Sequence, residues 1–207
     1  MAKKSTYNAK DIEVLEGLEP VRKRPGMYIG STNQDGLHHL VNEVLDNSID
    51  EVLAGHATDI SFQYKKDGSI KIKDNGRGIP IDFHPKYKNK RALEVVLTTL
   101  HAGGKFNSNA YKTSGGLHGV GISVVNALSS LLQVQVFKDG KVYRQDYSKG
   151  KVKTKIKIEK CSKKLKGTEI SFIPDESIFE ETQFVPKKLY NFINMKSFFV
   201  YLRQNYL

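Results

Sequence analysis

The chain has 207 residues, 39% of them hydrophobic and 27% charged, which is ordinary for a globular protein that buries a core. Its net charge of +11 raises the question of a nucleic-acid partner, whereas the single Cys161 excludes an internal disulfide and favours a reducing, cytoplasmic setting. The sequence has no apolar run of about 18 residues and no apolar stretch behind its first residues, so neither a membrane span nor a signal peptide is expected.

The N-terminal part of the sequence predicts an arm followed by one domain. Residues 1–11 are polar and predict a flexible arm, whereas residues 12–207 are expected to form the domain. A short helix is expected over residues 12–18, ending before Glu19-Pro20. Pro25-Gly26 predicts a turn in the loop that spans residues 22–28.

A long helix and a hairpin are expected next. Residues 36–54 place apolar side chains at steps of three and four, which is typical of an amphipathic helix, and Gly55 stands where a C-terminal cap is expected. Residues 60–64 and 70–73 alternate in polarity on either side of Asp67-Gly68, which predicts a β-hairpin.

The rest of the chain predicts more helices and strands around a glycine-rich segment. A helix is expected over residues 92–100, an irregular loop over residues 101–121 with its six glycines, and an apolar helix over residues 122–132. Further strands are expected at residues 132–138, 141–147, 151–158 and 168–173. Together these elements predict an α+β fold, a two-layer sandwich in which helices cover one face of a mixed, mostly antiparallel sheet.

The positive charge is concentrated late in the sequence. Nine lysines lie between Lys149 and Lys166, and they occupy every second position from Lys151 to Lys157. This alternation predicts a strand with one solvated lysine face, a pattern that protects a sheet edge from mispairing. A surface for DNA or another partner is the alternative.

Three polar residues, His39, Glu43 and Asn47, recur every four positions on the expected helix and line one stripe beside its apolar side. Glu43 can act as a general base on a water poised against a γ-phosphate, with His39, one turn earlier, as the second candidate catalytic residue. Asn47 offers a neutral oxygen to Mg²⁺, which prefers oxygen ligands. The alternative is an ordinary surface helix, on which such spacing is common.

The segment Asp74-Asn-Gly-Arg-Gly78 follows the hairpin. A carboxylate held at Asp74 can accept the exocyclic amine of adenine, while the glycines let the ring approach the backbone. The alternative is a turn in which Asp and Gly supply backbone geometry. Arg77 is expected to form a structural ion pair with Glu51.

The glycine-rich loop from Gly115 to Gly121 leads directly into a helix, an arrangement that binds anions through exposed N–H groups and the helix dipole. Its spacing differs from that of a P-loop. So long an irregular segment inside a domain is usually functional, often a lid, and Lys105, Tyr111 and Lys112 give it charges and a ring to contact a nucleotide. The alternative is a mobile surface loop. In contrast, His38, His39, His101 and His118 lack ligand-spaced partners, so no zinc site is expected.

In this order the helix, the Asp74 block and the glycine loop predict an ATP-hydrolysing site. Further matching segments are Tyr7-Asn8, Val14–Leu18, Val21–Gly30, Asp46–Glu51, Leu100–Phe106, Tyr111-Lys112, Ser114–Gly121 and Gly167-Thr168. With these motifs, nearly all of the chain from Tyr7 to about Phe184 resembles the ATPase domain of the B subunits of bacterial type II DNA topoisomerases, within the GHKL superfamily. Tyr7-Asn8 and Phe172–Phe179 look more like topoisomerase IV than DNA gyrase.

The resemblance implies the GHKL (Bergerat) ATP-binding fold, with the helical layer lining the nucleotide pocket. It implies Glu43 as the general base, Asn47 as the Mg²⁺ ligand, and Asp74 as the adenine-reading carboxylate, which Thr168 joins through a shared water. Further nucleotide contacts are implied for Gly78, Ile79, Pro80, Lys105, Tyr111, Gly116, Leu117, His118, Gly119, Val120 and Gly121. Tyr7 and Ile12 resemble an arm that reaches the partner's nucleotide across an ATP-closed dimer.

The implied activity is ATP-driven closure of a homodimer of B subunits, which powers DNA strand passage together with a topoisomerase A subunit. Aminocoumarin inhibitors are implied to compete with ATP at Asp74, Arg77 and Pro80, although Lys138 stands where gyrases often carry arginine. The family's next domain, with a lysine for the γ-phosphate, would follow Leu207. A chain of this extent is therefore expected to bind ATP, to hydrolyse it slowly, and to be monomeric or weakly dimeric.

Three other interpretations remain open from the sequence. The parent protein could be a gyrase B rather than a topoisomerase IV B protein. A non-enzymatic, basic nucleic-acid-binding module would show salt-sensitive DNA affinity with no effect of nucleotide. An Hsp90-like chaperone domain would bind client proteins, but the loop Arg22–Gly26 resembles topoisomerases instead.

Overall fold

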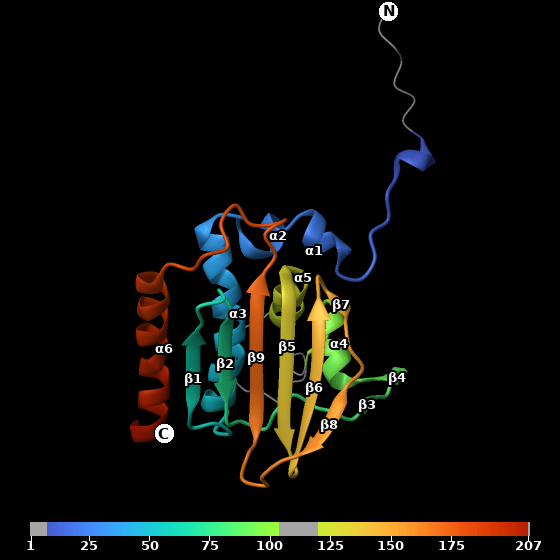
Figure 1. Cartoon of the computed structure of the whole chain (residues 1–207). Coiled ribbons are helices and arrows are strands. Elements are labelled where there is room, and N and C mark those ends of the chain that lie inside the picture. Colours follow the sequence, from blue (N-terminus) through green and yellow to red (C-terminus); the bar gives the residue numbers. More distant parts are fainter. Residues whose placement is uncertain (1–7, 104–119, 207) are drawn as a thin grey trace, which may run out of the picture.

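A seven-stranded sheet forms one layer of the protein, and helices cover one of its faces (Figure 1). The structure is a computed structural model, and it describes residues 8–103 and 120–206. The strands follow the order β1 (Ile60–Tyr64), β2 (Ile70–Asp74), β9 (Gly167–Pro174), β5 (Ser129–Lys138), β6 (Lys141–Ser148) and β7 (Lys151–Val152), and β8 (Lys157–Lys160) also pairs with β6. The pairings between these strands are antiparallel, so the predicted α+β sandwich is confirmed with an antiparallel rather than a mixed sheet.

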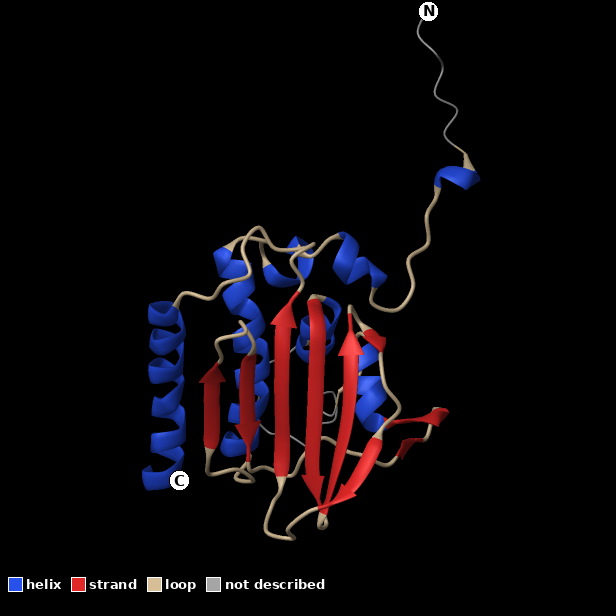
Figure 2. Ribbon diagram, in the orientation of Figure 1, coloured by secondary structure: helices blue, strands red, loops and turns tan. Residues whose placement is uncertain are grey.

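The helices lie mainly behind this sheet, as Figure 2 shows. The covering layer consists of α3 (Gln34–Leu53), α4 (Ala92–Thr98) and α5 (Gly121–Ala127). The remaining elements are η1 (Ala9–Asp11), α1 (Glu19–Lys23), α2 (Gly26–Ile29), the hairpin β3 (Phe83–His84) and β4 (Tyr87–Arg91), and α6 (Pro186–Tyr206), which packs against α3. Among the residues described, no helix is both long and apolar enough to cross a membrane.

The predicted long helix is α3, and its ends follow the capping rules. The Asn33 side chain accepts the backbone N–H of Asp35 at 2.9 Å, which caps the first turn. Gly55 follows the last turn with a φ of 79°, a conformation that glycine adopts without strain. The apolar stripe of α3 is buried against the sheet, and each such leucine or valine contributes about 1.5–3 kcal/mol relative to an exposed one.

His38 belongs to the core rather than to a metal site. It is buried, and its Nδ1 lies 2.6 Å from the carbonyl oxygen of Gln34 while Nε2 accepts the backbone N–H of Val185 at 3.2 Å. These two partners fit the neutral tautomer with its proton on Nδ1. His38 therefore ties α3 to the segment that leads into α6.

Two predictions for the N-terminal segment were wrong. No helix covers residues 12–18, and a helix begins instead at Glu19 with Pro20 in its first turn. Proline lacks an N–H donor, which the first turn of a helix does not need, so Pro20 starts a helix here rather than ending one. The predicted loop over residues 22–28 is mostly helical, and the expected turn at Pro25 lies in the short break between α1 and α2.

Two later elements also differ from the prediction. The helix expected over residues 122–132 ends at Ala127, and a strand begins at Ser129. Pairing with β6 and β9 on both sides makes this part a strand, and a run of apolar residues alone does not reveal that pairing. The expected strand 151–158 is divided into β7 and β8. Between them the Thr154 hydroxyl accepts the Asp146 N–H at 3.0 Å, so a side chain replaces the regular ladder. The β3–β4 hairpin and α6 were not predicted.

Arg22 connects α1 to the sheet through a buried carboxylate. Its guanidinium donates to the carbonyl oxygen of Ala127, at the end of α5, and to Asp175, directly after β9, both at 2.7 Å. Lys149 contacts the other Asp175 oxygen at 3.3 Å, and the Asp175 side chain is 1% exposed. One ion-pair cluster thus joins three elements that are distant in the sequence.

We expect Asp175→Asn to lower the free energy of unfolding by about 3 kcal/mol at neutral pH. Burial opposes ionisation of Asp175, but hydrogen bonds from Arg22, Ser177 and Lys149 outweigh it and hold the pKa below its ordinary value. A lowered folded-state pKa gives stabilisation that is present above the unfolded pKa of about 3.9 and is lost as the pH falls through the folded value. Urea unfolding at pH 7 and pH 3 measures this difference, which should shrink at the lower pH.

Asp35→Asn is the matched control, because it removes an exposed pair with Lys188 and should change the unfolding midpoint little. An equal loss for Asp175→Asn at both pH values would show that the ion pair is not the source of the stability.

Candidate active site

Asp74, the last residue of β2, is held in the layer between sheet and helices with 6% of its surface exposed. Its Oδ1 accepts the backbone N–H groups of Gly76 at 2.9 Å and Thr168 at 3.2 Å, and its Oδ2 accepts the Ser48 hydroxyl at 3.2 Å. Burial raises the Asp74 pKa in spite of these hydrogen bonds. Since a carboxylate oxygen has two lone pairs, Oδ2 retains the capacity to accept one further donor.

The glycines around Asp74 allow backbones to approach closely. A Cβ at Gly167, where φ is 104°, would overlap with the carbonyl oxygen of Asp74. At Gly76 a Cβ would lie 2.8 Å from Glu51 Oε2, and at Gly78 it would lie 2.9 Å from a Val136 methyl group. The block is therefore a tight turn, as the alternative prediction held, and it also encloses a buried carboxylate.

Thr168 connects Asp74 to the next stretch of chain. Its backbone N–H donates to Asp74, and its hydroxyl accepts the backbone N–H of Ile79 at 3.1 Å. Ile79 is partly buried and Pro80 is exposed. Four of the predicted adenine-contacting residues are thus brought together here, namely Asp74, Gly78, Ile79 and Thr168.

The predicted ion pair between Arg77 and Glu51 is confirmed. Glu51 Oε2 accepts the backbone N–H and the Nε–H of Arg77 at 2.9 and 3.2 Å, and Oε1 accepts an Nη2 hydrogen at 2.7 Å. The carboxylate of Glu51 is nearly buried. This bidentate contact fastens the turn after β2 to α3 and therefore has a structural role.

Glu43 lies against the start of α5. Its Oε1 is 3.0 Å from His39 Nε2, and a Cβ at Gly121 would overlap with its Oε2. The hydrogen bond to Glu43 raises the pKa of His39, against a smaller opposing effect of partial burial. The stripe predicted from spacing therefore orients a carboxylate toward the end of the glycine-rich segment.

Asn47 lies one turn beyond Glu43 on α3 and is partly buried. Val120 directly precedes α5, and Gly121 is its first residue. The other predicted contacts fall outside the residues that the structure describes, namely Tyr7, Lys105, Tyr111, Lys112, Gly116, Leu117, His118 and Gly119. Ile12 directly follows η1, and this segment lies away from the body of the protein in Figure 1.

Sequence reasoning missed Ser48, which donates to Asp74. The sequence pattern could have indicated this residue, because Ser48 is a polar residue among the buried apolar positions of α3. Two surface hollows of about 200 and 270 Å³ lie elsewhere, one beside Asn33 and one beside Gly68, and neither is lined by residues of this site. The arrangement of side chains around Asp74, and not a surface hollow, therefore identifies the candidate site.

Comparison with known proteins agrees with this chemistry. The family model described as "Histidine kinase-, DNA gyrase B-, and HSP90-like ATPase" matches residues 32–178. The chain belongs to this ATPase family. Its relatives include the B subunit of DNA topoisomerase 4 from Rickettsia bellii, 61% identical over 94% of this chain and 30% of that protein. The B subunit of DNA gyrase from Thermotoga maritima is 58% identical over 87% of this chain and 28% of that protein.

Solved structures show the same fold. The 43K ATPase domain of Thermus thermophilus gyrase B, in complex with an aminocoumarin, aligns with a TM-score of 0.78 and 42% identity over 88% of this chain and 46% of that one. The topoisomerase IV ATP-binding domain of Francisella tularensis, in complex with a small-molecule inhibitor, aligns with a TM-score of 0.73 and 41% identity over 87% of this chain and 47% of that one. The predicted resemblance to the B subunits of topoisomerases is confirmed, and the chain spans about 30% of the first of these curated relatives.

We expect Glu43→Gln to lower the pKa of His39 toward the ordinary value of about 6.5, because the hydrogen bond that His39 donates to the carboxylate raises it. A raised folded-state pKa means that the pair stabilises the fold fully below the unfolded pKa, and that this stabilisation is lost as the pH rises through the folded value. Titration of the imidazole ring protons by NMR measures the shift.

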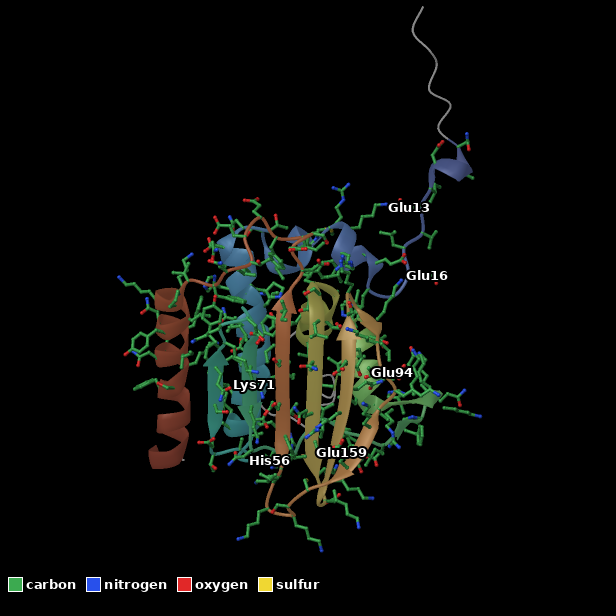
Figure 3. The ribbon with its side chains drawn as sticks, viewed as in Figure 1. Glu13, Glu16, His56, Lys71, Glu94 and Glu159 are labelled. Carbon is green, nitrogen blue, oxygen red and sulfur yellow. The ribbon has the colours of Figure 1, made fainter. Side chains whose placement is uncertain are left out.

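Glu94→Gln, on helix α4, which packs against α5 (Figure 3), is the matched control and should leave the pKa of His39 unchanged. A His39 pKa that is the same in the wild type and in Glu43→Gln would contradict the contact.

Proposed function

We propose that this chain is the ATP-binding and ATP-hydrolysing domain of the B subunit of a bacterial type II DNA topoisomerase, of the topoisomerase IV kind. The observation that carries the proposal is the buried Asp74, whose Oδ2 has acceptor capacity left after its contact with Ser48. Membership of the ATPase family and 61% identity to the B subunit of a topoisomerase 4 support it. Gyrase B is the alternative, since the relative from Thermotoga maritima is nearly as similar.

In this proposal Asp74 reads the adenine. Its free acceptor position takes the exocyclic amine, while the turn at Gly78, Ile79 and Pro80 walls the ring and Thr168 contributes through a shared water. The buried Asp74 carboxylate can accept one more hydrogen bond, which matches a single amine donor. In this buried place the hydrogen bond excludes water and is electrostatically stronger than it would be in solution. A purely nucleic-acid-binding module gives no reason to bury this charge.

Hydrolysis is assigned to the stripe on α3. Glu43 would accept the proton of the attacking water, and His39 would act as a positioning residue that orients the carboxylate from 3.0 Å. Asn47 fits Mg²⁺ because its side chain offers a neutral oxygen, and Mg²⁺ takes few protein ligands while keeping phosphate and water oxygens. When bound, Mg²⁺ supplies positive charge to the phosphates. Tyr7, Lys105, Tyr111 and Gly116 to Gly121 remain predicted contacts to ribose and phosphates.

The wider assembly follows as a proposal from the relatives, of which this chain covers about 30%. We assign residues 1–11 to an arm and 12–207 to the ATPase domain of a longer cytoplasmic protein. That protein would form an ATP-closed homodimer of B subunits and act on DNA with an A subunit. Aminocoumarin-type inhibitors would contact Asp74, Arg77 and Pro80, since the Thermus thermophilus domain was solved with such a compound.

We expect Asp74→Asn to weaken binding of a non-hydrolysable ATP analogue by about 100-fold or more, because a charge-assisted hydrogen bond is replaced by an amide that repels the amine. The thermal midpoint should stay the same or rise. Burial raises the folded-state pKa of Asp74, so folding stability falls as the pH rises from the unfolded pKa through the folded one, and asparagine removes that cost at neutral pH.

Isothermal calorimetry with Mg²⁺ present and thermal unfolding measure these two effects. Unchanged affinity in Asp74→Asn would overturn the adenine assignment. Absence of binding to the wild type, both in this chain and in one extended by the next domain, would overturn the proposed function.

We expect Glu43→Gln to keep analogue affinity within a few-fold and to lower the rate of hydrolysis by about 10²–10⁴. The amide keeps the shape of the side chain but cannot take a proton from water. Single-turnover hydrolysis with the protein in excess over ATP measures the chemical step. Glu94→Gln serves again as the control, and a hydrolysis rate of Glu43→Gln equal to that of the control would rule out Glu43 as the base.

A further inference from the structure

A row of three lysines crosses one end of the sheet. Lys138, at the end of β5, lies directly opposite Lys141 on β6, and Lys141 lies directly opposite Lys160 on β8. Opposite residues on antiparallel strands share a face with Cβ atoms about 5 Å apart, and like charges in such positions destabilise a sheet. The repulsion between these lysines therefore lowers the stability of the fold, so a role in folding does not explain why they lie together.

The loop after β8 adds to this charge. The backbone N–H of Cys161 donates to the carbonyl oxygen of Gly140 at 2.8 Å, and a Cβ at Gly140 would lie 3.0 Å from the Cγ of Lys163. This packing places the loop beside the turn between β5 and β6. We define the lysine cluster as Lys138, Lys141, Lys160, Lys163 and Lys164, all of which are exposed except the partly buried Lys138.

Two cations elsewhere on the same sheet are paired with carboxylates. Arg144 contacts Glu159 at 3.1 Å, and Lys71 contacts Glu169 at 2.6 Å; Figure 3 labels Glu159 and Lys71. Within the described part of the chain, no ion pair involves a lysine of the cluster. Among the described residues, the five lysines of the cluster therefore lie together without a carboxylate that pairs with them.

Protection of the sheet edge accounts for only part of the cluster. Lysine on an edge strand prevents mispairing with another sheet, which explains Lys160 on β8. Lys138, however, ends β5, which lies between β6 and β9, although Lys138 itself pairs only with β6 because the register with β9 ends at Phe137. An interior strand needs no such protection.

The cluster also lies beside the candidate active site. Val136 pairs with Thr168, and Lys138 is two residues further along the same strand, so it lies on the same face about 7 Å beyond. The charges extend from β5 across β6 to β8, over about 10 Å at the usual spacing of strands. This spread suits a line of phosphates better than the compact triphosphate of one nucleotide.

We propose that the lysine cluster is a contact surface for the phosphate backbone of duplex DNA. DNA presents one negative charge per about 1.7 Å of helix axis, and lysines bind it as point charges without reading sequence. The inference rests on the proposed function only in its choice of DNA as the polyanion. Binding to the cluster requires no nucleotide.

The test compares two triple variants of the chain that change charge equally. Lys141→Glu, Lys160→Glu and Lys163→Glu alter the cluster but leave Lys138, which adjoins the candidate site. Lys65→Glu, Lys66→Glu and Lys187→Glu alter exposed lysines outside the cluster and form the matched control. The affinity for a fluorescent duplex of about 30 base pairs is measured by anisotropy between about 50 and 200 mM salt, the range over which phosphate contacts lose affinity steeply.

We expect the wild type to bind with a slope of log affinity against log salt near −4.5, the value for about five phosphate contacts. The cluster variant should lose about 2.7 of that slope, since three contacts are removed, and should bind at least about 10-fold more weakly at low salt. The control should stay close to the wild type. Equal losses in both variants, or no measurable affinity of the wild type, would overturn the proposal.

Failure of the proposed function gives a different result. The cluster variant should bind the ATP analogue as the wild type does, because its three lysines lie outside the nucleotide contacts. If the wild type does not bind the ATP analogue but its DNA binding still depends on the lysine cluster, the proposed ATPase function is overturned and the DNA contact surface is kept. If the glutamates lower the thermal midpoint, the same comparison is made with glutamine, which removes the charges without adding new ones.

Discussion

The packing of α3 against the sheet fixes almost every part of the candidate site. The apolar side of this helix is buried over the strands, and its polar positions then lie at defined places around the buried layer. Ser48 meets Asp74, Glu51 meets Arg77, and Glu43 meets the first residue of α5. A rotation of the helix about its axis would break all three contacts together. Burial of the apolar side of α3 therefore fixes the positions of the polar side chains of the site.

The site also shows a conflict between stability and function. Asp74 is kept in a place where burial raises its pKa, and its hydrogen bonds to Gly76, Thr168 and Ser48 only partly offset that effect. Asp175 has the opposite balance, because Arg22 and Lys149 neutralise it. Asp175 therefore serves the fold, whereas an incompletely satisfied carboxylate at Asp74 makes sense if a ligand completes its hydrogen bonding.

Prediction from the sequence succeeded where contacts are local. The helix α3, its glycine cap and the β1–β2 hairpin follow from periodicity and turn residues, and the pair between Arg77 and Glu51 follows once hairpin and helix are packed together. It failed at Ser129, where pairing with β6 and β9 turns an apolar run into a strand. It also failed where a local signal has two meanings, since Pro20 starts a helix rather than ending one and Thr154 interrupts a strand by bonding to Asp146.

The sequence by itself determined the chemical groups of the site and their spacing, because a helical repeat places His39, Glu43 and Asn47 on one stripe whatever the helix packs against. Only the tertiary structure decided the environment of Asp74, since Ser48 and Thr168 reach it from distant parts of the chain and burial depends on all the neighbouring elements. It also decided the register that aligns Lys138, Lys141 and Lys160. Strand pairing is a long-range property, and a shift of one residue would move each side chain to the other face.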